Sequence, residues 1–351
     1  MFWDKFKKNK ETKTETAPEE PSVKQASAGD FVYGVEEIFK LSDEDINDLT
    51  ATQLSDIYMA FLVSTSSDPE QRVPFKEKID RLMKALCEKI LASKEVYVVY
   101  SERTGEPFMF AHTSKQEDGN FMVTPPDIIV ISKAYYPVLK DVYSQNGFEL
   151  KLISNGDDGK GIYNELGRAF YLNGACGVRF NALNFSIGNA VIVEKPDYSD
   201  QPEVNVPVSN PDLVRWMLMM GQIAEPDTED KKTIYGIYYN FLTQEIGKAK
   251  FLIPMSGDLP KGDENGKAVL EKGTKIGFPI REGKDGRQTI CAFTDWYRLR
   301  KVFDEKWSGM IQSLDGMIEI FDYTINASDH PAEGIYFSKA AYDLLKSKEN
   351  K

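Results

Sequence analysis

The order of segments along this chain occurs twice, and this repetition constrains the fold more than any other feature. One helical pattern ends at Lys94 and another at Lys250, and each leads directly into an apolar run. A turn and strand at 173–181 likewise correspond to a turn and strand at 330–338. The offsets are 156 and 157 residues, which is too long for a solenoid repeat. The sequence therefore predicts a duplicated domain.

The predicted fold class is α+β, as two tandem copies of a compact mixed-sheet domain with flanking helices and a disordered N-terminal arm. In both copies, a helix with an apolar stripe precedes a strand and a hairpin. The hairpin turns are the Asp-Gly pairs at 118–119 and 285–286, because Asp-Gly favours tight hairpin turns. The same patterns predict helices over 132–143 and 316–325.

Changes in composition divide the chain into five segments. Residues 1–30 form a basic-aromatic start and a disordered tether, because they are too poor in aliphatic side chains to build a core. Residues 31–74 are expected to be a helical extension, with Ser42 as an N-cap. The first domain is predicted at 75–195 and the second at 231–351. Between them, 196–230 is a proline-rich linker followed by a short amphipathic helix.

Composition and charge exclude several classes of protein. The chain is 41% hydrophobic and carries a net charge of −12, so long-range repulsion argues against a nucleic-acid partner. No apolar run approaches the length of about 20 residues that crosses a bilayer, and no signal peptide is present. Three widely spaced cysteines, Cys87, Cys176 and Cys291, argue against a disulfide framework. A reducing cytoplasm is the simplest setting.

The first ten residues suggest weak contact with a membrane surface. As a helix, they place aromatic side chains on one face, with lysines around the rest. Four lysines at about 1 kcal/mol each supply about 4 kcal/mol, which corresponds only to millimolar binding. The alternative is a terminal segment without a binding role. The candidate membrane-contact residues are Phe2, Trp3, Lys5, Phe6, Lys7 and Lys8.

Methionine and tryptophan side chains supply a candidate protein-binding surface. The amphipathic segment after the linker contains Trp216, Met217 and Met220, and Trp296 and Trp307 occur in the second copy. Such side chains suit adaptable contacts with a protein partner. The alternative is that they are buried and brace the two domains, which is the stronger interpretation for the segment after the linker.

No recognisable reaction centre is present, so no catalytic, cofactor-binding or metal-binding residue is predicted. The two histidines, His112 and His330, lack neighbours at metal-ligand spacing. The loop at 155–161 lacks the ending of a phosphate-binding loop, and 263–266 lacks the pattern of a calcium loop. Both are interpreted as turns rich in residues that tolerate positive φ.

Four short motifs in the second copy occur in an order typical of one known family. They are Phe251-Leu252-Ile253-Pro254, Gly277-Phe278-Pro279-Ile280, Ala292-Phe293-Thr294-Asp295-Trp296 and Ala332-Glu333-Gly334-Ile335-Tyr336-Phe337-Ser338. In this order they resemble the SseB N-terminal domain family. The asparagine and proline that usually follow the last motif are replaced by Ser338 and Lys339.

The first copy resembles the same family more loosely. Phe121-Met122-Val123-Thr124 stands where the Phe-Thr motif belongs, and Asn181 is kept without the proline. The resemblance implies a bacterial protein with compact α+β domains. It supplies no site residues, because the family has no established catalytic residues and no settled molecular activity.

Three functions remain open at this point. The leading hypothesis is a non-catalytic bacterial interaction or regulatory protein of the cytoplasm, whose partner is a protein. The first alternative is an enzyme or small-molecule-binding protein with a pocket between the two copies, using Asp158, Asn181 or His330. The second is a peripheral membrane adaptor that uses residues 1–10. Exposed aromatic surface would favour the first hypothesis, and a polar cleft would favour the pocket.

Overall fold

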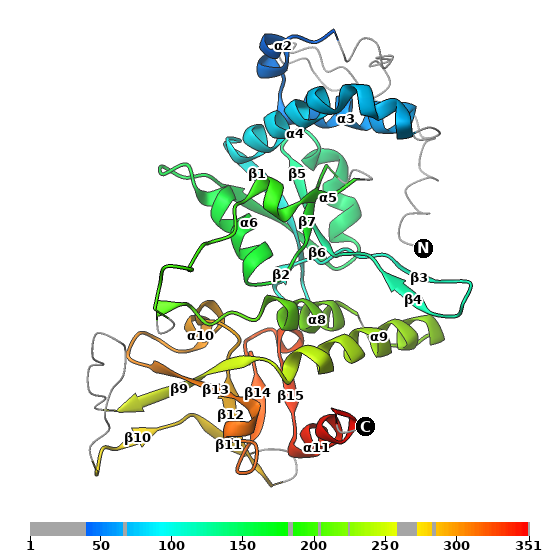
Figure 1. Cartoon of the computed structure of the whole chain (residues 1–351). Coiled ribbons are helices and arrows are strands. Elements are labelled where there is room, and N and C mark those ends of the chain that lie inside the picture. Colours follow the sequence, from blue (N-terminus) through cyan, green and yellow to red (C-terminus); the bar gives the residue numbers. More distant parts are fainter. Residues whose placement is uncertain are drawn as a thin grey trace.

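The computed structural model describes residues 40–65, 69–181, 185–202, 205–223, 225–257, 272–282 and 286–349 (Figure 1). The N-terminal arm lies outside these residues, as does the loop at 263–266. The six candidate membrane-contact residues therefore stay a prediction: Phe2, Trp3, Lys5, Phe6, Lys7 and Lys8. Within the described ranges, no helix is both long and apolar enough to cross a bilayer.

The described chain begins with helices that cap one end of the molecule. They are α2 (Asp43–Asp48), α3 (Ala51–Ser64), η2 (Pro69–Phe75) and α4 (Lys76–Leu91). The predicted N-cap at Ser42 is observed, because its hydroxyl accepts from the amide of Asp45 and the Asp45 carboxylate accepts from the amide of Ser42. Thr50 and Gln53 form the same reciprocal cap at α3. Such caps satisfy amides that the first turn leaves without partners.

A six-stranded mixed sheet forms the centre of the first half, which we define as residues 40–195. Its strand order is β2-β1-β5-β7-β8, with β6 paired to the free side of β1. Only β5 and β7 are parallel among these pairs. The strands are β1 (Glu95–Ser101), β2 (Glu106–Pro107), β5 (Asp127–Ser132), β6 (Phe148–Ser154), β7 (Gly177–Phe180) and β8 (Ile187–Gly188).

Helices cover both faces of this sheet. On one face, α5 (Tyr136–Ser144) buries Leu139 and Tyr143 against Val99 and Ile129. On the other face, α4 and α6 (Gly161–Tyr171) pack with residues of β1, β5 and β7 in the main core. The short helix α7 (Asn189–Ile192) lies against α4. Because β5 is covered on both faces, five of its six residues are buried.

The second half, residues 229–349, has the same kinds of element. Its helical segments are α9 (Glu229–Ile246), α10 (Trp296–Val302), η4 (Leu314–Gly316), η5 (Pro331–Glu333) and α11 (Lys339–Glu349). Its strands are β9 (Lys250–Gly257), β10 (Ile276–Gly277), β11 (Ile280–Glu282), β12 (Gln288–Ala292), β13 (Ser308–Ser313), β14 (Asp322–Ile325) and β15 (Ile335–Phe337). The predicted hairpin is observed as β11 paired antiparallel to β12.

Strand order and direction agree between the halves. In the first half β1 is antiparallel to β6 and to β5, β5 is parallel to β7, and β7 is antiparallel to β8. In the second half β9 is antiparallel to β13 and meets Phe293, which follows β12, in an antiparallel bridge. There β12 is parallel to β14, and β14 is antiparallel to β15.

Two asparagines mark the same point in both halves. Asn181 and Asn326 each follow the strand parallel to the central one, and each has φ of 54°. The Asn181 side chain accepts from the amide of Ser132, and the Asn326 side chain accepts from the amide of Thr294. Asparagine tolerates this left-handed conformation better than most residues.

Three sequence predictions are wrong in this region. The strand equivalent to β7 is β14, so the pairing of 173–181 with 330–338 is not the structural one. No helix is observed at 316–325: a 3-10 turn ends at Gly316, 317–320 form a turn, and 322–325 are β14. The residue of the first half that is equivalent to Thr294 is Ser132, at the end of β5, and not Thr124. The segment Phe121–Val123 is instead β4, which pairs with β3 (Thr113–Lys115) in a separate hairpin.

The helix predicted at 132–143 is correct only from Tyr136 onward. Of the predicted residues before it, 133–135 form a turn and Ser132 ends the central strand β5, which the sequence analysis did not assign. The aliphatic run at 128–131 lies just after Pro126, and a short buried run of this kind shows neither strand alternation nor helical spacing.

The helix α8 (Pro211–Gln222) lies between the halves and joins their cores (Figure 1). It packs against α9 and against η5 of the second half. Six of its side chains are buried, and they belong to one apolar cluster that includes residues of both halves. The helix thus braces the two sheets instead of spacing them apart.

Candidate functional site

The two halves also meet at a polar seam, where backbone segments approach closely. On α8, a Cβ placed on Gly221 would lie 1.9 Å from the carbonyl oxygen of Ala332 in η5. In the turn between β1 and β2, a Cβ on Gly105 would lie 2.5 Å from the ring of His330, and Gly105 has φ of +65°. Glycine is needed at both positions, because a side chain would push the second half away from α8 at Gly221 and away from the first half at Gly105.

Glu106 is the centre of the seam on the first-half side. It is fully buried in β2, and one carboxylate oxygen accepts from Arg168 of α6 at 2.5 Å and from Asn173 at 2.8 Å. The other oxygen accepts from Lys301 of α10, which belongs to the second half. One carboxylate therefore holds cations from both halves.

Arg298 is the corresponding centre on the second-half side. Its side chain is 1% exposed, and its guanidinium donates to Asp295 and to the side-chain oxygen of Asn173, both at 2.7 Å. It also lies 3.1 Å from Glu333, which in turn accepts from Lys301 at 2.9 Å. Asn173 thus bridges the two centres, because its amide nitrogen donates to Glu106 while its oxygen accepts from Arg298.

We name Glu106, Arg168, Arg298, Lys301 and Glu333 the seam network. Burial by itself would raise the pKa of Glu106, but the charges of Arg168, Arg298 and Lys301 outweigh it and lower this pKa to about 2. Burial opposes the charged forms of Arg168 and Lys301, yet the neighbouring carboxylates raise the pKa of both. These three groups therefore hold fixed charges at neutral pH.

Beside the seam network lies a hollow of about 600 Å³, which we name the inter-half cleft. Its lining comes from both halves and includes Lys151, Arg281, Tyr297, Lys301, His330 and Glu333. Among the described residues, Oε2 of Glu333 accepts no hydrogen bond, although this side chain is 1% exposed. A buried carboxylate oxygen without a donor costs free energy, and the residue that carries it also lines the inter-half cleft.

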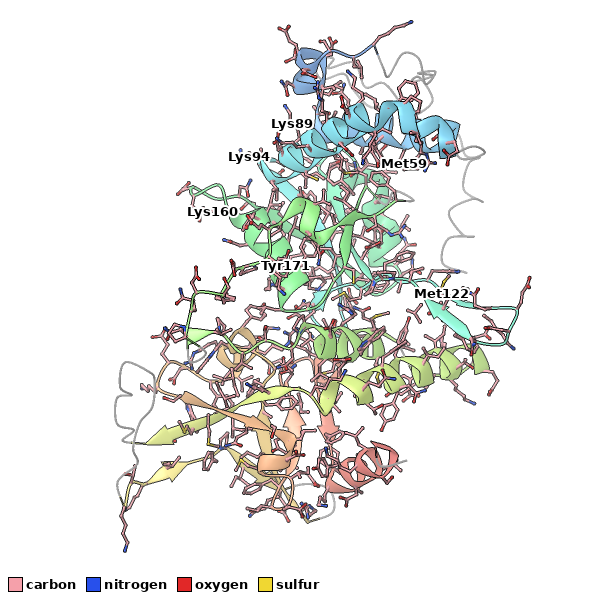
Figure 2. The ribbon with its side chains drawn as sticks, viewed as in Figure 1. Met59, Lys89, Lys94, Met122, Lys160 and Tyr171 are labelled. Atoms are coloured by element: carbon pink, nitrogen blue, oxygen red, sulfur yellow. The ribbon has the colours of Figure 1, made fainter. Side chains whose placement is uncertain are left out.

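A larger hollow of about 870 Å³ lies between α6 and the linker that leads to α8. Its walls are mainly apolar, from side chains such as Tyr163, Phe170 and Tyr198. Two of the polar side chains there already have partners. Tyr171, labelled in Figure 2, donates to the carbonyl of Val193, and Arg215 donates to the carbonyl of Gly174. This hollow therefore offers a mainly apolar wall, with the donors of Tyr171 and Arg215 already used within the chain.

The five residues of the predicted protein-binding surface lie in two places. Met217 and Met220 are buried in α8, at 1% and 7% exposure, so they brace the halves and present no free surface. Trp216 is half-buried and stacks on Phe241. Trp296 and Trp307 are half-buried in the second half, where Phe303 packs against Trp307.

The three polar residues predicted to meet in a pocket do not converge. His330 lines the inter-half cleft. Asn181 is buried beside β5, where it holds the amide of Ser132. Asp158 is exposed in the loop before α6 and accepts from the amide of Lys160, which is labelled in Figure 2. The pocket between the halves exists, but its residues are largely different ones.

The seam network itself was missed by the sequence analysis. Its members are charged residues from four separate elements, and nothing in the sequence distinguishes a charged residue that will be buried from one that will be solvated. Glu106 and Lys301, for example, are 195 residues apart. In α10, Arg298 and Lys301 are one turn apart, a weak hint that both face the same way.

The described residues give no indication of metal or thiol chemistry. Among them, no three His, Cys, Asp or Glu side chains are grouped as they would be around a metal ion. Burial raises the pKa of the Cys87 thiol to about 11, and it also raises the pKa of Cys176 and of Cys291. Cys87 and Cys291 are buried.

Comparison with known proteins gives one match. Residues 239–313 match the family described as SseB protein N-terminal domain. These residues include three of the four motifs on which the resemblance was based, together with α10 and β13. The family resemblance of the second half is therefore confirmed, while the tandem arrangement stays a prediction. No curated protein and no solved structure matches the chain.

Proposed function

This chain carries an SseB N-terminal domain in its second half, and we propose that it is a non-catalytic bacterial binding protein of the cytoplasm. In this proposal a small polar molecule binds in the inter-half cleft. The carrying observation is the unpartnered Oε2 of Glu333, a residue that lines a cleft formed by both halves. This is the small-molecule-binding form of the pocket alternative in the sequence analysis.

The charges of the seam network support a binding role. A general acid or base works best when its pKa lies near the operating pH. Glu106 titrates near 2, and the pKa values of Arg168 and Lys301 are raised, so these groups neither gain nor lose protons at neutral pH. Fixed charges suit the holding of a ligand and the locking of two halves.

The same proposal treats the first half as a divergent SseB-like copy. Its support is the agreement of strand order and direction between the halves, together with the matching conformations of Asn181 and Asn326. A duplicated domain of this kind places a cleft at the junction of its copies, where binding sites commonly form.

Equilibrium dialysis against a bacterial metabolite extract tests the binding role. We expect at least one compound to be enriched by the wild-type protein. Val302→Trp fills the cleft and should reduce this enrichment by about tenfold or more. Val138→Trp is the matched control, because Val138 is an exposed helical valine that does not line the cleft. Absence of enrichment with the wild type, or unchanged enrichment with Val302→Trp, would contradict the proposal.

A second candidate function is binding to a protein through the β3–β4 hairpin. The hairpin projects from the first half toward α9, and Tyr238 of α9 contacts Thr113 (Figure 2). Strand β4 of the hairpin carries Phe121 and Met122, whose side chains are 41% and 51% exposed. Exposed aromatic and methionine side chains are typical anchors for a protein partner.

A photo-crosslinking residue at position 122, in living bacteria, tests this candidate. We expect a discrete protein adduct at position 122 that disappears when Phe121 is replaced by serine. The same residue at position 320 is the control, because Ile320 is an exposed aliphatic side chain, at 67%, on the other half. Equal adducts at both positions, or none at 122, would remove the hairpin as a partner site.

A further inference from the structure

We infer that the inter-half cleft binds a small hydroxylated anion, in which a phosphate or carboxylate group lies close to a hydroxyl group. This inference rests on the proposed binding function and adds the chemical class of the ligand. Two separate features of the lining carry it. One is a pair of cations at the mouth, and the other is the unpartnered carboxylate oxygen at the floor.

The cations at the mouth come from opposite halves. Lys151 extends from β6, with its ammonium 4.6 Å from the ring of Tyr100, and Arg281 extends from β11. Among the described residues, neither of them forms an ion pair. Asp329 is the one acidic side chain at the mouth in this part of the chain. The mouth therefore carries a net positive charge, which favours an anionic group between the halves.

The floor of the cleft requires a different group. Lys301 already pairs with both Glu106 and Glu333, so its charge is compensated. Oε2 of Glu333 needs a hydrogen-bond donor, yet Lys301 and Arg298 lie next to the same carboxylate. A second cation would be repelled by these two, whereas a neutral hydroxyl can donate without adding charge.

The walls define the size of the ligand. The ring of His330 packs on Gly105 along one side, and Tyr297, at 39% exposure, forms part of another. A volume of about 600 Å³ is within the range typical of small-molecule sites. Because Lys151 belongs to one half and Arg281 to the other, a bound anion would link the halves.

Isothermal titration calorimetry at low ionic strength tests the ligand class with four probes. Glycerol 3-phosphate and malate combine an anion with a hydroxyl, inorganic phosphate supplies the anion alone, and glycerol supplies the hydroxyl alone. We expect at least one of the first two to bind about tenfold or more tightly than phosphate and glycerol. The probe that binds more tightly identifies the anionic group as phosphate or carboxylate.

Charge-removing variants locate the site. Lys151→Gln and Arg281→Gln should each weaken binding of the better probe by about tenfold or more. Both side chains are exposed, so the variants should keep the fold, which thermal unfolding can verify. Lys140→Gln is the matched control, because Lys140 is exposed on α5 and does not line the cleft.

Two results would overturn the inference. One is equal affinity for inorganic phosphate and for the better hydroxylated probe, since the carboxylate of Glu333 would then contribute nothing to binding. The other is an absence of binding by glycerol 3-phosphate and malate alike. Suppose that calorimetry gives either result, while dialysis still shows a compound that the wild type enriches and the Val302→Trp variant does not. The proposed ligand class is then wrong, and the proposed binding function stands. If dialysis also fails, both are wrong.

Discussion

Replacing Arg298 with methionine is expected to lower the free energy of unfolding by about 3 to 5 kcal/mol. The side chain is 1% exposed and compensates Asp295 and Glu333, which are themselves 1% exposed. Methionine fills part of the volume but leaves both buried carboxylates without their shared cation. Urea denaturation followed by fluorescence measures the loss. This is the largest effect that we expect from a single substitution.

Two comparisons separate the buried charge from general damage. Arg81→Met removes an arginine that is 58% exposed and paired with Asp43, and it should cost less than about 1 kcal/mol. Adding Asp295→Asn and Glu333→Gln to Arg298→Met should recover part of the loss, because the uncompensated charges are removed as well. A loss as small as that of Arg81→Met would show that the seam network does not stabilise the fold.

The second large effect is a loss of stability in acid that depends on Glu106. Its pKa falls from 4.5 to about 2 on folding, so the unfolded chain binds the proton more readily than the folded one. The stabilisation is fully present above pH 4.5 and is lost as the pH falls through about 2. The expected size is on the order of 3 kcal/mol. Denaturation curves between pH 6 and pH 2 measure it.

The Glu106→Gln variant isolates this group from the other carboxylates. It should be less stable than the wild type at pH 6, because a neutral glutamine cannot form ion pairs with Arg168 and Lys301. Its stability should then decrease less steeply in acid, so that the two proteins approach each other near pH 2. Parallel curves over the whole range would mean that Glu106 is not linked to folding in this way.

Both predictions concern the same structural feature, the polar seam between two apolar cores. The core that runs through α8 supplies non-directional burial, which tolerates small rotations of one half against the other. Asn173, Glu106 and Arg298 add directional contacts that fix one arrangement. Since the inter-half cleft is lined by Lys301 and Glu333 of the same network, its shape depends on that arrangement.

Much of the local structure could be predicted from the sequence. The cap at Ser42, the helix at Lys76–Leu91 and the strand at Glu95–Ser101 depend on neighbouring residues and on one apolar stripe. The α+β class and the family of the second half follow from short motifs of the same local kind. These features are encoded within about 20 residues, so reading along the chain is sufficient.

The parallel strand pairs and the site were decided only by the tertiary structure. The strands β5 and β14 are short, and β5 is buried on both faces, so what identifies each as a strand is pairing with a partner distant in sequence. The polar seam joins residues that are still farther apart in the sequence, because Glu106 and Lys301 are separated by 195 residues. A charge on its own predicts a solvated side chain. Only the packing of one half against the other removes water and makes these charges a network.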